Sequence, residues 1–583
     1  MSDRVKRPWQ IRRPDPEAAV RLARTLGVSP VMGQLLLNRD LGDPAVAARW
    51  LDVPKDDLPA ADAVPGAAEG GEVLAAACRA GARVCVYGDY DVDGTTGAAT
   101  LYRTLGALGA DVQVYIPHRL EEGYGLNAAA VRRIAAARFT HLVTVDCGIA
   151  SPAEIALARS LGMTPVVSDH HQPKATLPDA ILVHPALAGR PSAAPNLCGS
   201  AVAWTLGRAA VRAAVGRGGT PDHLRDILRD GLARAAIGTV ADVVPLVAEN
   251  RAVVRHGLAR LRGTADTGLA ALLEVCGLKD KPVMAEDVGF KIGPRINAAG
   301  RLGAAGRVID LLGVTQPADE AARLAAYLDY ANGTRQRTER AILGASRDQG
   351  AEQVKDGRAA VVAAADDWHP GVIGIVGSRL VERFGRPALV VSFGTASGVG
   401  YGSGRSIPGL ALHEALDACG AHLVSHGGHA MAAGFKVRPE NYAAFRAAFW
   451  DYCAARYGGP PPPPPLVVEA EARVEQLSLE MVRDLAKLEP HGAGNPRPFF
   501  LLRGCRVERA KLIGERQDHL SMTVSHPGPK ANQIRCVGFG MGERVEEVKG
   551  FVDVIGVPKI NEWMGRKSVE MELKDFRPTP ATR

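Results

Sequence analysis

Three aspartates stand at alternate positions in the segment 88–94, whose sequence is GDYDVDG. Asp89, Asp91 and Asp93 are so close in the chain that their charges repel one another unless a cation neutralises them. Carboxylate oxygens favour Mg²⁺ or Mn²⁺ as that cation. A calcium-binding loop would need a glutamate at its twelfth position, which counted from Asp89 is Thr100. The segment alone therefore leaves two alternatives, a divalent-metal site and a solvated acidic turn.

Three further groups of acidic or imidazole residues follow apolar runs later in the chain. Asp146 follows HLVTV, the triplet Asp169, His170 and His171 follows TPVVS, and Asp242 follows ARAAIGTV. We expect these runs to end side by side at one edge of a parallel sheet, which is where ligands bind in such folds. A lone buried aspartate is usually a helix cap, and a lone histidine is usually structural. Four such groups within one unit instead predict a metal centre.

The elements that position these groups are predicted to be alternating strands and helices. We expect strands at 82–87, 111–116, 141–145 and 164–167, and helices at 97–108 and 152–161. This alternation predicts an α/β fold, with a parallel sheet covered by helices on both faces. The residues before it, 1–75, are polar and broken by prolines, and we expect them to form an amino-terminal helical cap.

The remainder of the chain is expected to contain a second α/β domain and a small β-barrel. Residues 317–355 have a helical period, which predicts one or two long helices between a catalytic domain at 76–316 and a second α/β domain at 356–459. The six prolines at 460–465 predict an extended linker. Short β-like runs within 466–583 suggest an all-β barrel, for which an OB-like fold is one candidate.

Length and composition restrict the class of protein. A chain of 583 residues is too long for a single hydrophobic core. The sequence has no apolar run near the roughly 20 residues that cross a bilayer, and its charged start lacks the apolar stretch of a secretory signal. Nine cysteines without a Cys-x-x-Cys pair favour reduced, mostly buried thiols and a cytoplasmic location. The net charge of +7 permits a polyanionic partner without requiring one.

Four motifs resemble those of the DHH phosphoesterase superfamily, which is named after its Asp-His-His triplet. These motifs are GDYDVDG, VDCG, SDHH and ADVVP. GSGRS at 402–406 and GGHAMAAGF at 427–435 resemble the DHHA1 domain that accompanies it. Within the superfamily the chain is most similar to the RecJ exonucleases, through GPRINAAGR at 293–301, WHPGVIGIVGSRL at 368–380 and HGAGNPRPFF at 491–500. The resemblance extends from about residue 50 to about residue 575.

The resemblance implies a catalytic centre with two divalent ions, Mn²⁺ or Mg²⁺. It implies that Asp146 bridges the ions, that Asp91 with help from Asp89 binds one of them, and that the other is bound by Asp93, His170 and Asp242. In pyrophosphatase relatives the first motif opens with a histidine, so the ion that each acid holds stays open here.

The same resemblance gives the second histidine of the triplet a role toward the substrate. His171 is expected to contact the scissile phosphate or to protonate the leaving oxygen, and Asp169 to orient a neighbouring imidazole. Two ions about 4 Å apart would supply both a nucleophile and charge neutralisation for phosphodiester hydrolysis. A hydrolase of this kind needs no P-loop, and the sequence has no GxxxxGK[ST] motif.

The segment GSGRS is expected to bind phosphate, because its glycines let the backbone approach and Ser403, Arg405 and Ser406 offer donors. Without the family resemblance it would be taken for a flexible turn. His429 is expected to face the metals, and the alternative is a structural histidine in a turn.

Four residues of the first domain are candidates for contacts with the nucleic acid. Arg119 is expected to hold a terminal phosphate. Arg295 and Arg301 are candidates for contacts with the strand backbone, and salt bridges between the lobes are the alternative. Tyr124 is a candidate for base stacking, although an isolated tyrosine is more often half-buried without a function.

The motifs predict a metal-dependent phosphodiester hydrolase. The resemblance implies that it is an exonuclease that degrades single-stranded DNA from 5′ to 3′ into mononucleotides, in repair and recombination. An OB-like carboxyl-terminal domain would bind the strand through cations and stacking. The expected partners are single-strand-binding protein and helicases, and the expected state is a monomer.

Two alternatives stay open at this point. One is a DHH-family phosphodiesterase acting on short RNA or dinucleotides, or a pyrophosphatase. The residues that follow the prolines argue for a polymer instead. The other is a non-catalytic replication scaffold, against which every metal position carries a competent ligand.

Overall fold

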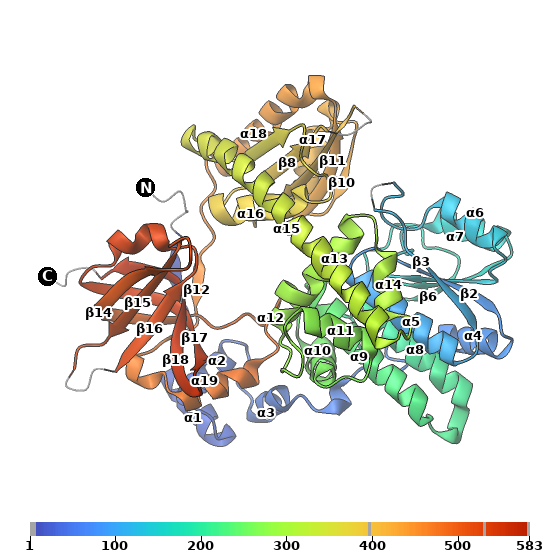
Figure 1. Ribbon diagram of the computed structural model, residues 1–583, viewed down its shortest axis with the longest axis horizontal. Coiled ribbons are helices and arrows are strands. Elements are labelled where there is room, and N and C mark those ends of the chain that lie inside the picture. The colour runs from blue at the N-terminus through green and yellow to red at the C-terminus, as the bar shows by residue number, and fades with distance from the viewer. Residues whose placement is uncertain (1–6, 120, 395–397, 529–531, 580–583) are drawn as a thin grey trace. The chain divides into compact units, whose positions relative to one another are not determined.

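The computed structural model describes residues 7–119, 121–394, 398–528 and 532–579, and the chain divides into two compact units (Figure 1). The first unit comprises Arg49–Thr334 with Leu488–Pro496. The second comprises Met1–Ala48, Arg335–Lys487 and Arg497–Arg583. One continuous helix, α15 at Ala318–Lys355, passes from the first unit to the second, where the sequence predicts one or two long helices.

The first unit contains a five-stranded sheet in the order β3-β2-β4-β5-β6, and every pairing in it is parallel. The strands are β2 at Arg83–Gly88, β3 at Asp111–Tyr115, β4 at His141–Val145, β5 at Thr164–Ser168 and β6 at Ile181–Val183. The prediction of a parallel α/β sheet is therefore confirmed, and β6 is an additional strand. The direction of strand addition reverses at β2. In open parallel sheets ligands bind beside such a point, here at the carboxyl ends of β2 and β4.

Different helices cover the two faces of this sheet. Side chains alternate along β2, so that Val84 and Val86 join one hydrophobic core and Cys85 and Tyr87 join another. Helices α4 at Ala67–Arg79, α5 at Val92–Ala107, α8 at Gly199–Val215 and α9 at Asp222–Ala241 contribute to the first core. Helices α6 at Ala128–Ala136 and α7 at Pro152–Ser160 contribute to the second.

The start of α5 differs from the prediction. The sequence predicts a helix from residue 97, whereas α5 begins at Val92 because Asp91 caps it. The remaining helical segments of this unit extend the first core. They are α10 at Ala248–Leu261, α11 at Thr267–Val275, α12 at Ala285–Asp287, the π-helix η3 at Val288–Ile292, α13 at Gly293–Arg301 and α14 at Gly306–Leu312.

The second unit contains a mixed five-stranded sheet in the order β10-β11-β9-β8-β7. Its strands are β7 at Val361–Ala365, β8 at Ala388–Ser392, β9 at Gly400–Arg405, β10 at Ser425–Gly428 and β11 at Ala432–Val437. Its helices are α16 at Ile373–Phe384, α17 at Leu412–Ala418 and α18 at Tyr442–Tyr457. Most of the glycine-rich GSGRS segment is thus a strand, paired on both sides with β8 and β11, and not a flexible turn.

A six-stranded sheet follows in the same unit, in the order β13-β14-β15-β16-β18-β17. Pairing of β14 with β17 closes five of these strands into a barrel, and β13 pairs with β14 beside it. The strands are β13 at Ala470–Glu471, β14 at Phe500–Ile513, β15 at His519–Ser525, β16 at Gln533–Gly538, β17 at Phe551–Trp563 and β18 at Arg566–Pro578. The short helix α19 at Leu479–Leu485 precedes β14. The predicted small β-barrel is confirmed.

The amino-terminal segment belongs to the second unit as far as Ala48. Strand β1 at Trp9–Ile11 pairs in parallel with β12 at Leu466–Val468, directly after the proline run. Helices α1 at Pro16–Leu26, α2 at Pro30–Leu37 and α3 at Pro44–Asp52 follow β1. Arg39 forms an ion pair of 2.6 Å with Glu469, and both side chains are buried, so the beginning of the chain is fixed to the strand region that leads into the barrel.

Two predictions from composition can be compared with the structure. All nine cysteines are free and buried, as expected for reduced thiols. Among the described residues, no helix combines the length and the apolar character that crossing a membrane requires.

Candidate metal centre

The turn after β2 and the beginning of α5 carry the first three acidic residues. Asp89 follows β2, Asp91 caps α5 by accepting a hydrogen bond of 3.1 Å from the amide of Gly94, and Asp93 lies in the first helical turn. A Cβ atom on Gly94 would lie 2.6 Å from the backbone of Asp89. The glycine therefore allows the close turn that groups the three carboxylates.

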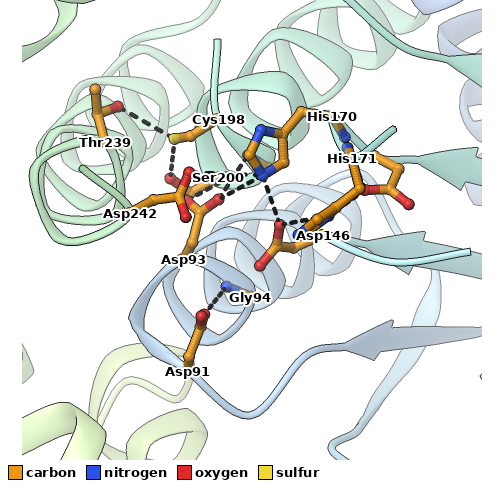
Figure 2. A network of polar contacts seen from close by, with 12 residues as sticks. Asp91, Asp93, Gly94, Asp146, His170, His171, Cys198, Ser200, Thr239 and Asp242 are labelled. Atoms are coloured by element: carbon orange, nitrogen blue, oxygen red, sulfur yellow. Dashed lines mark hydrogen bonds and ion pairs between the residues drawn. The ribbon is translucent and has the colours of Figure 1, made fainter. Parts of the chain in front are cut away.

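The imidazole of His170 is surrounded by three carboxylates from three other segments (Figure 2). Its Nε2 atom lies 3.1 Å from Oδ1 of Asp146, 3.6 Å from Oδ2 of Asp242 and 3.8 Å from Oδ2 of Asp93. Asp146 directly follows β4 and adopts a φ of 62°. Such a backbone conformation is uncommon outside glycine, and strain of this kind is concentrated at functional sites.

These side chains form three overlapping groups, in each of which the potential ligand atoms lie within 4.8 Å of one another. The groups are Asp146, His170 and His171; Asp93, His170 and Asp242; and Asp89, Asp91 and Asp146. Asp146 and His170 each belong to two groups. Shared ligands of this kind are what two adjacent ions require.

The unsatisfied atoms of the site fit divalent ions. Within the part of the chain that the structure describes, Oδ1 of Asp89, Oδ1 of Asp146 and Nε2 of His170 are buried and have no hydrogen-bond partner. Buried polar atoms without a partner are rare, and an ion or a water molecule commonly accounts for them. Carboxylate oxygens with one imidazole suit Mg²⁺ or Mn²⁺.

The pKa values of the acidic residues also favour a divalent-metal site. Burial, followed by the charges of neighbouring aspartates, raises the pKa of Asp89 and of Asp146 well above the usual range. The same two causes raise the pKa of Asp91 and bring the pKa of Asp242 to about 8. Carboxylates that repel one another in this way are stabilised as anions when a divalent cation lies among them.

Asp169 and His171 form a pair beside these residues. The Asp169 carboxylate accepts hydrogen bonds from the amides of Ile149, His170 and His171, and its Oδ1 lies 2.9 Å from Nδ1 of His171. Burial alone would raise the pKa of Asp169, but His171 and the amides outweigh it and lower the pKa. For His171 burial acts downward, and Asp169 outweighs it and raises the pKa to about 9.

The hydroxyl of Tyr124 contacts both Asp146 and His171. The hydroxyl oxygen lies 3.1 Å from Nδ1 of His171 and donates a hydrogen bond of 3.2 Å to the carbonyl oxygen of Asp146. The side chain remains 52% exposed. The sequence suggested base stacking for this residue, and the contact with His171 was not anticipated.

The fourth acidic motif was expected at the end of a strand, and this prediction is wrong. Asp242 is the carboxyl-terminal cap of helix α9. The run ARAAIGTV consists of small and apolar residues, and such runs do not distinguish a buried strand from a buried helix. Asp242 still joins the group formed by Asp93 and His170.

The arginines predicted in the first unit lie in different surroundings. The guanidinium of Arg119 stacks over the ring of Tyr90, 4.8 Å from its centroid, and its charge acts on Asp89. The charge of Arg301 acts on Tyr90 from α13. Arg295 instead pairs with Asp329 at 2.8 Å and donates to two backbone carbonyls, so its guanidinium is engaged within the unit.

The predicted phosphate-binding residues of the second unit lie along β9 and the β10–β11 turn. Arg405 donates hydrogen bonds to Oγ of Ser403 at 3.2 Å and to the carbonyl of Gly404 at 2.7 Å. Ser406 is buried and donates to the carbonyl of Leu410 at 2.7 Å. His429 is exposed in the turn between β10 and β11.

The sequence did not reveal two residues that contact the acidic cluster through their backbones. The amides of Gly199 and Ser200, at the start of α8, donate hydrogen bonds to Asp93. Their one signal in the sequence is a pair of small residues ahead of the apolar run AVAWTL.

Three family models match the chain. They are the DHH family, N-terminal domain, over residues 83–229, the DHHA1 domain over 356–455, and the RecJ OB domain over 468–575. The matched ranges cover the sheet with the acidic cluster, the mixed sheet and the barrel.

Curated relatives and solved structures are similar over nearly the whole chain. The single-stranded-DNA-specific exonuclease RecJ of Bacillus subtilis is 35% identical over 98% of this chain and 71% of its own length. The protein of that description from Thermus thermophilus is 37% identical over 95% of this chain and 78% of its own. The crystal structure of RecJ in complex with Mn²⁺ from Thermus thermophilus is 34% identical, with a TM-score of 0.83, over 100% of this chain and 81% of that structure.

Proposed function

The chain belongs to the RecJ family of single-stranded-DNA-specific exonucleases, and from this premise we propose that it hydrolyses single-stranded DNA with two divalent ions bound to its acidic cluster. The observation that carries this function is the arrangement around His170, whose Nε2 atom faces three carboxylates of separate segments. The RecJ structures from Thermus thermophilus described as complexes with Mn²⁺ and with Mg²⁺ support both metals.

The ligand groups suggest which residues hold which ion. Asp146 would be shared between the ions, because it groups with Asp89 and Asp91 and also lies 3.1 Å from His170 of the other site. Asp89 and Asp91 complete one ion site, while Asp93, His170 and Asp242 complete the other. When bound, the ions supply a nucleophile at neutral pH and neutralise charge on the phosphate.

His171 is the residue that we assign to the leaving group. Asp169 holds its Nδ1 atom at 2.9 Å, and the Tyr124 hydroxyl approaches the same ring. Because its pKa is raised to about 9, the imidazole holds a proton at neutral pH. It is therefore able to donate that proton to the oxygen that leaves the phosphorus atom.

We assign recognition of the 5′ end of the strand to cations and hydroxyls outside the acidic cluster. Binding of that end would account for the 5′-to-3′ polarity and the mononucleotide products. Arg119 is the candidate in the first unit, supported by its place beside Tyr90 and Asp89. Ser403, Arg405 and His429 are the candidates in the second. Replacing Arg405 with alanine tests this assignment, since it should slow cleavage of 5′-phosphorylated strands more than that of 5′-hydroxyl strands.

The barrel is the part of the chain that we assign to binding of the strand. Closed small barrels of the OB type bind oligonucleotides, and the matching family model describes this domain as the RecJ OB domain. Single-strand-binding protein and helicases are the partners expected from the family, in DNA repair and recombination. Co-purification of each with the purified chain tests these partnerships.

One gel tests the function. End-labelled single-stranded DNA, duplex DNA, RNA and a dinucleotide are incubated with Mn²⁺, with Mg²⁺ and with EDTA. We expect loss of single-stranded DNA from its 5′ end, abolished by EDTA and by Asp146→Ala. Metal-dependent cleavage confined to dinucleotides would instead identify a short-substrate phosphodiesterase. Bound metal without any cleavage would identify a non-catalytic scaffold.

A further inference from the structure

The first turn of α8 holds the carboxylate of Asp93 through two backbone amides. Gly199 N–H donates to Oδ2 at 2.6 Å, and Ser200 N–H donates to Oδ1 at 2.9 Å. The first amides of a helix have no partner within the helix and carry partial positive charge, so they favour a carboxylate. With one amide on each oxygen, the rotation of the carboxylate group is fixed. Its remaining lone pairs are left for an ion.

Two glycines border the carboxylates of Asp146 and Asp93. A Cβ atom on Gly199 would lie 2.6 Å from Oδ1 of Asp146. A Cβ atom on Gly238 of α9 would lie 2.1 Å from Oγ of Ser200 and 2.5 Å from Oδ1 of Asp93. Neither glycine has the positive φ that favours glycine over other residues. Gly199 is the first residue of α8, and Gly238 lies inside α9, where alanine is the better helix former. Their lack of a side chain is therefore required by the carboxylates of Asp146 and Asp93 and by the side chain of Ser200, and not by the backbone.

A buried network connects the first turn of α8 with the last turns of α9 (Figure 2). The Sγ atom of Cys198 lies 3.3 Å from Oγ of Ser200 and 3.3 Å from Oγ1 of Thr239. Thr239 donates in turn to the carbonyl of Ala235 at 2.7 Å. Since Asp242 caps the end of α9, this network ties the amides that hold Asp93 to the helix that carries Asp242.

We propose that Gly199 and Ser200 of α8, together with Gly238 and Thr239 of α9, are positioning residues for the ion held by Asp93, His170 and Asp242. They fix the separation of the two carboxylates and thereby determine the affinity of this ion site. Gly199 also borders Asp146, which belongs to the other site, whereas the nearest neighbours of Gly238 are Ser200 and Asp93. Variants on α9 are therefore the ones that separate the two sites. The proposal rests on the proposed two-ion function and names the residues that support one of its two sites.

The test compares alanine at Gly238 with alanine at Gly207, which also lies in a buried helix. A Cβ atom on Gly207 would have its nearest neighbour at 3.4 Å, an ordinary contact, in Thr104. Binding of Mn²⁺ to the metal-free full chain is measured by titration calorimetry and by the electron paramagnetic resonance signal of free Mn²⁺. Thermal unfolding in EDTA is measured alongside. None of these readouts requires DNA or cleavage.

We expect Gly238→Ala to bind one Mn²⁺ like the unmodified chain and the second at least about tenfold more weakly, in the range seen when residues that orient metal ligands are changed. Gly207→Ala should bind both ions normally. Unchanged binding of both ions by Gly238→Ala would overturn the proposal. Equal weakening of both ions would also overturn it, because it would show a general disturbance of the cluster.

Thr239→Val provides the second variant, because it removes only the hydroxyl and keeps the shape of the side chain. It should unfold in EDTA near the temperature of the unmodified chain and weaken the same single ion by a few-fold. If it leaves both affinities unchanged while Gly238→Ala fails to fold, the network does not position the ion and the proposal is wrong. Normal binding of two ions without cleavage of DNA would contradict the proposed function and leave this inference unaffected.

Discussion

The Nε2 atom of His170 lies 3.1 Å from Oδ1 of Asp146, because the two residues follow neighbouring parallel strands whose last residues, Ser168 and Val145, are in register. Asp146 belongs to two of the three ligand groups, whereas Asp242 belongs to one. We therefore expect Asp146→Asn to weaken both ions and to lower the cleavage rate by more than about 100-fold. Asp242→Asn should weaken one ion. Titration with Mn²⁺ and single-turnover cleavage measure the two effects. Equal loss of both ions in the two variants would contradict the assignment.

The hydroxyl of Tyr124 should matter for the rate of cleavage and not for metal binding. Tyr124→Phe removes the contact with His171 and the hydrogen bond to the carbonyl of Asp146. A hydrogen bond of this kind contributes about 0.5–1.5 kcal/mol, so we expect kcat to fall by about 2- to 10-fold at saturating Mn²⁺, with unchanged Mn²⁺ affinity. Tyr102→Phe, in the second half of α5, is the control. A change confined to KM would indicate a contact with the strand instead, such as base stacking.

The stability of the metal-free protein should fall as the pH rises. Burial, followed by the charges of Asp93 and Asp91, raises the pKa of Asp242 to about 8, whereas an unfolded chain has a value of about 3.9. Between these values the folded chain holds a proton that the unfolded chain has released, so stability is lost from about pH 4 to about pH 8.

We therefore expect Tm in EDTA to be lower at about pH 8 than at about pH 6, and Asp242→Asn to reduce this difference. Mn²⁺ should stabilise the unmodified chain most at the higher pH, where the carboxylates are anions. A Tm in EDTA that increases over this interval would show that other groups dominate the pH dependence. Differential scanning calorimetry at several pH values makes the comparison.

Mutation of a buried charge cluster in the first unit should lower the free energy of unfolding more than mutation of an exposed ion pair. Asp266 pairs with Arg234 at 2.6 Å and with Arg103 at 3.2 Å, and the side chains of Asp266 and Arg234 are almost fully buried. Asp266→Ala leaves two arginines without this partner, for which we expect a loss of about 3–5 kcal/mol in the free energy of unfolding. Asp62→Ala removes an exposed pair with Arg212 and should cost less than about 1 kcal/mol. Urea denaturation of both variants checks the contrast.

The parts of the fold that depend on strand periodicity could be predicted from the sequence. Short apolar runs such as His141–Val145 are bounded by polar residues, and these runs are strands in the structure. β18 is harder to recognise, because RKSVEMELKDF is rich in charged residues although alternate side chains such as Met571 and Leu573 are buried in the barrel. Alternation with charges on the outer face gives a weaker signal than a continuous apolar run.

The candidate site also contains residues that could be predicted from the sequence and residues that could not. The acidic residues could be predicted because carboxylates and imidazoles that recur after apolar runs are typical of a metal site, and the helix position of Asp242 was missed because small apolar residues fit both elements. The amides of Gly199 and Ser200 could not be predicted, since every residue but proline has an amide and only the fold aims it. The pairing of β1 with β12 joins residues too distant in sequence for any local pattern to indicate.

That pairing has a consequence for how the chain is made on the ribosome. Trp9 pairs with Leu466, so about 450 residues must be synthesised before β1 meets its partner strand. At about 5–20 residues per second, this interval lasts between about 20 and 90 seconds. Once residue 183 has been made, the first unit has all five strands of its sheet available for folding, while β1 still has no partner strand. An affinity tag or a truncation at the amino terminus therefore acts on assembly of the carboxyl-terminal region, which is made last.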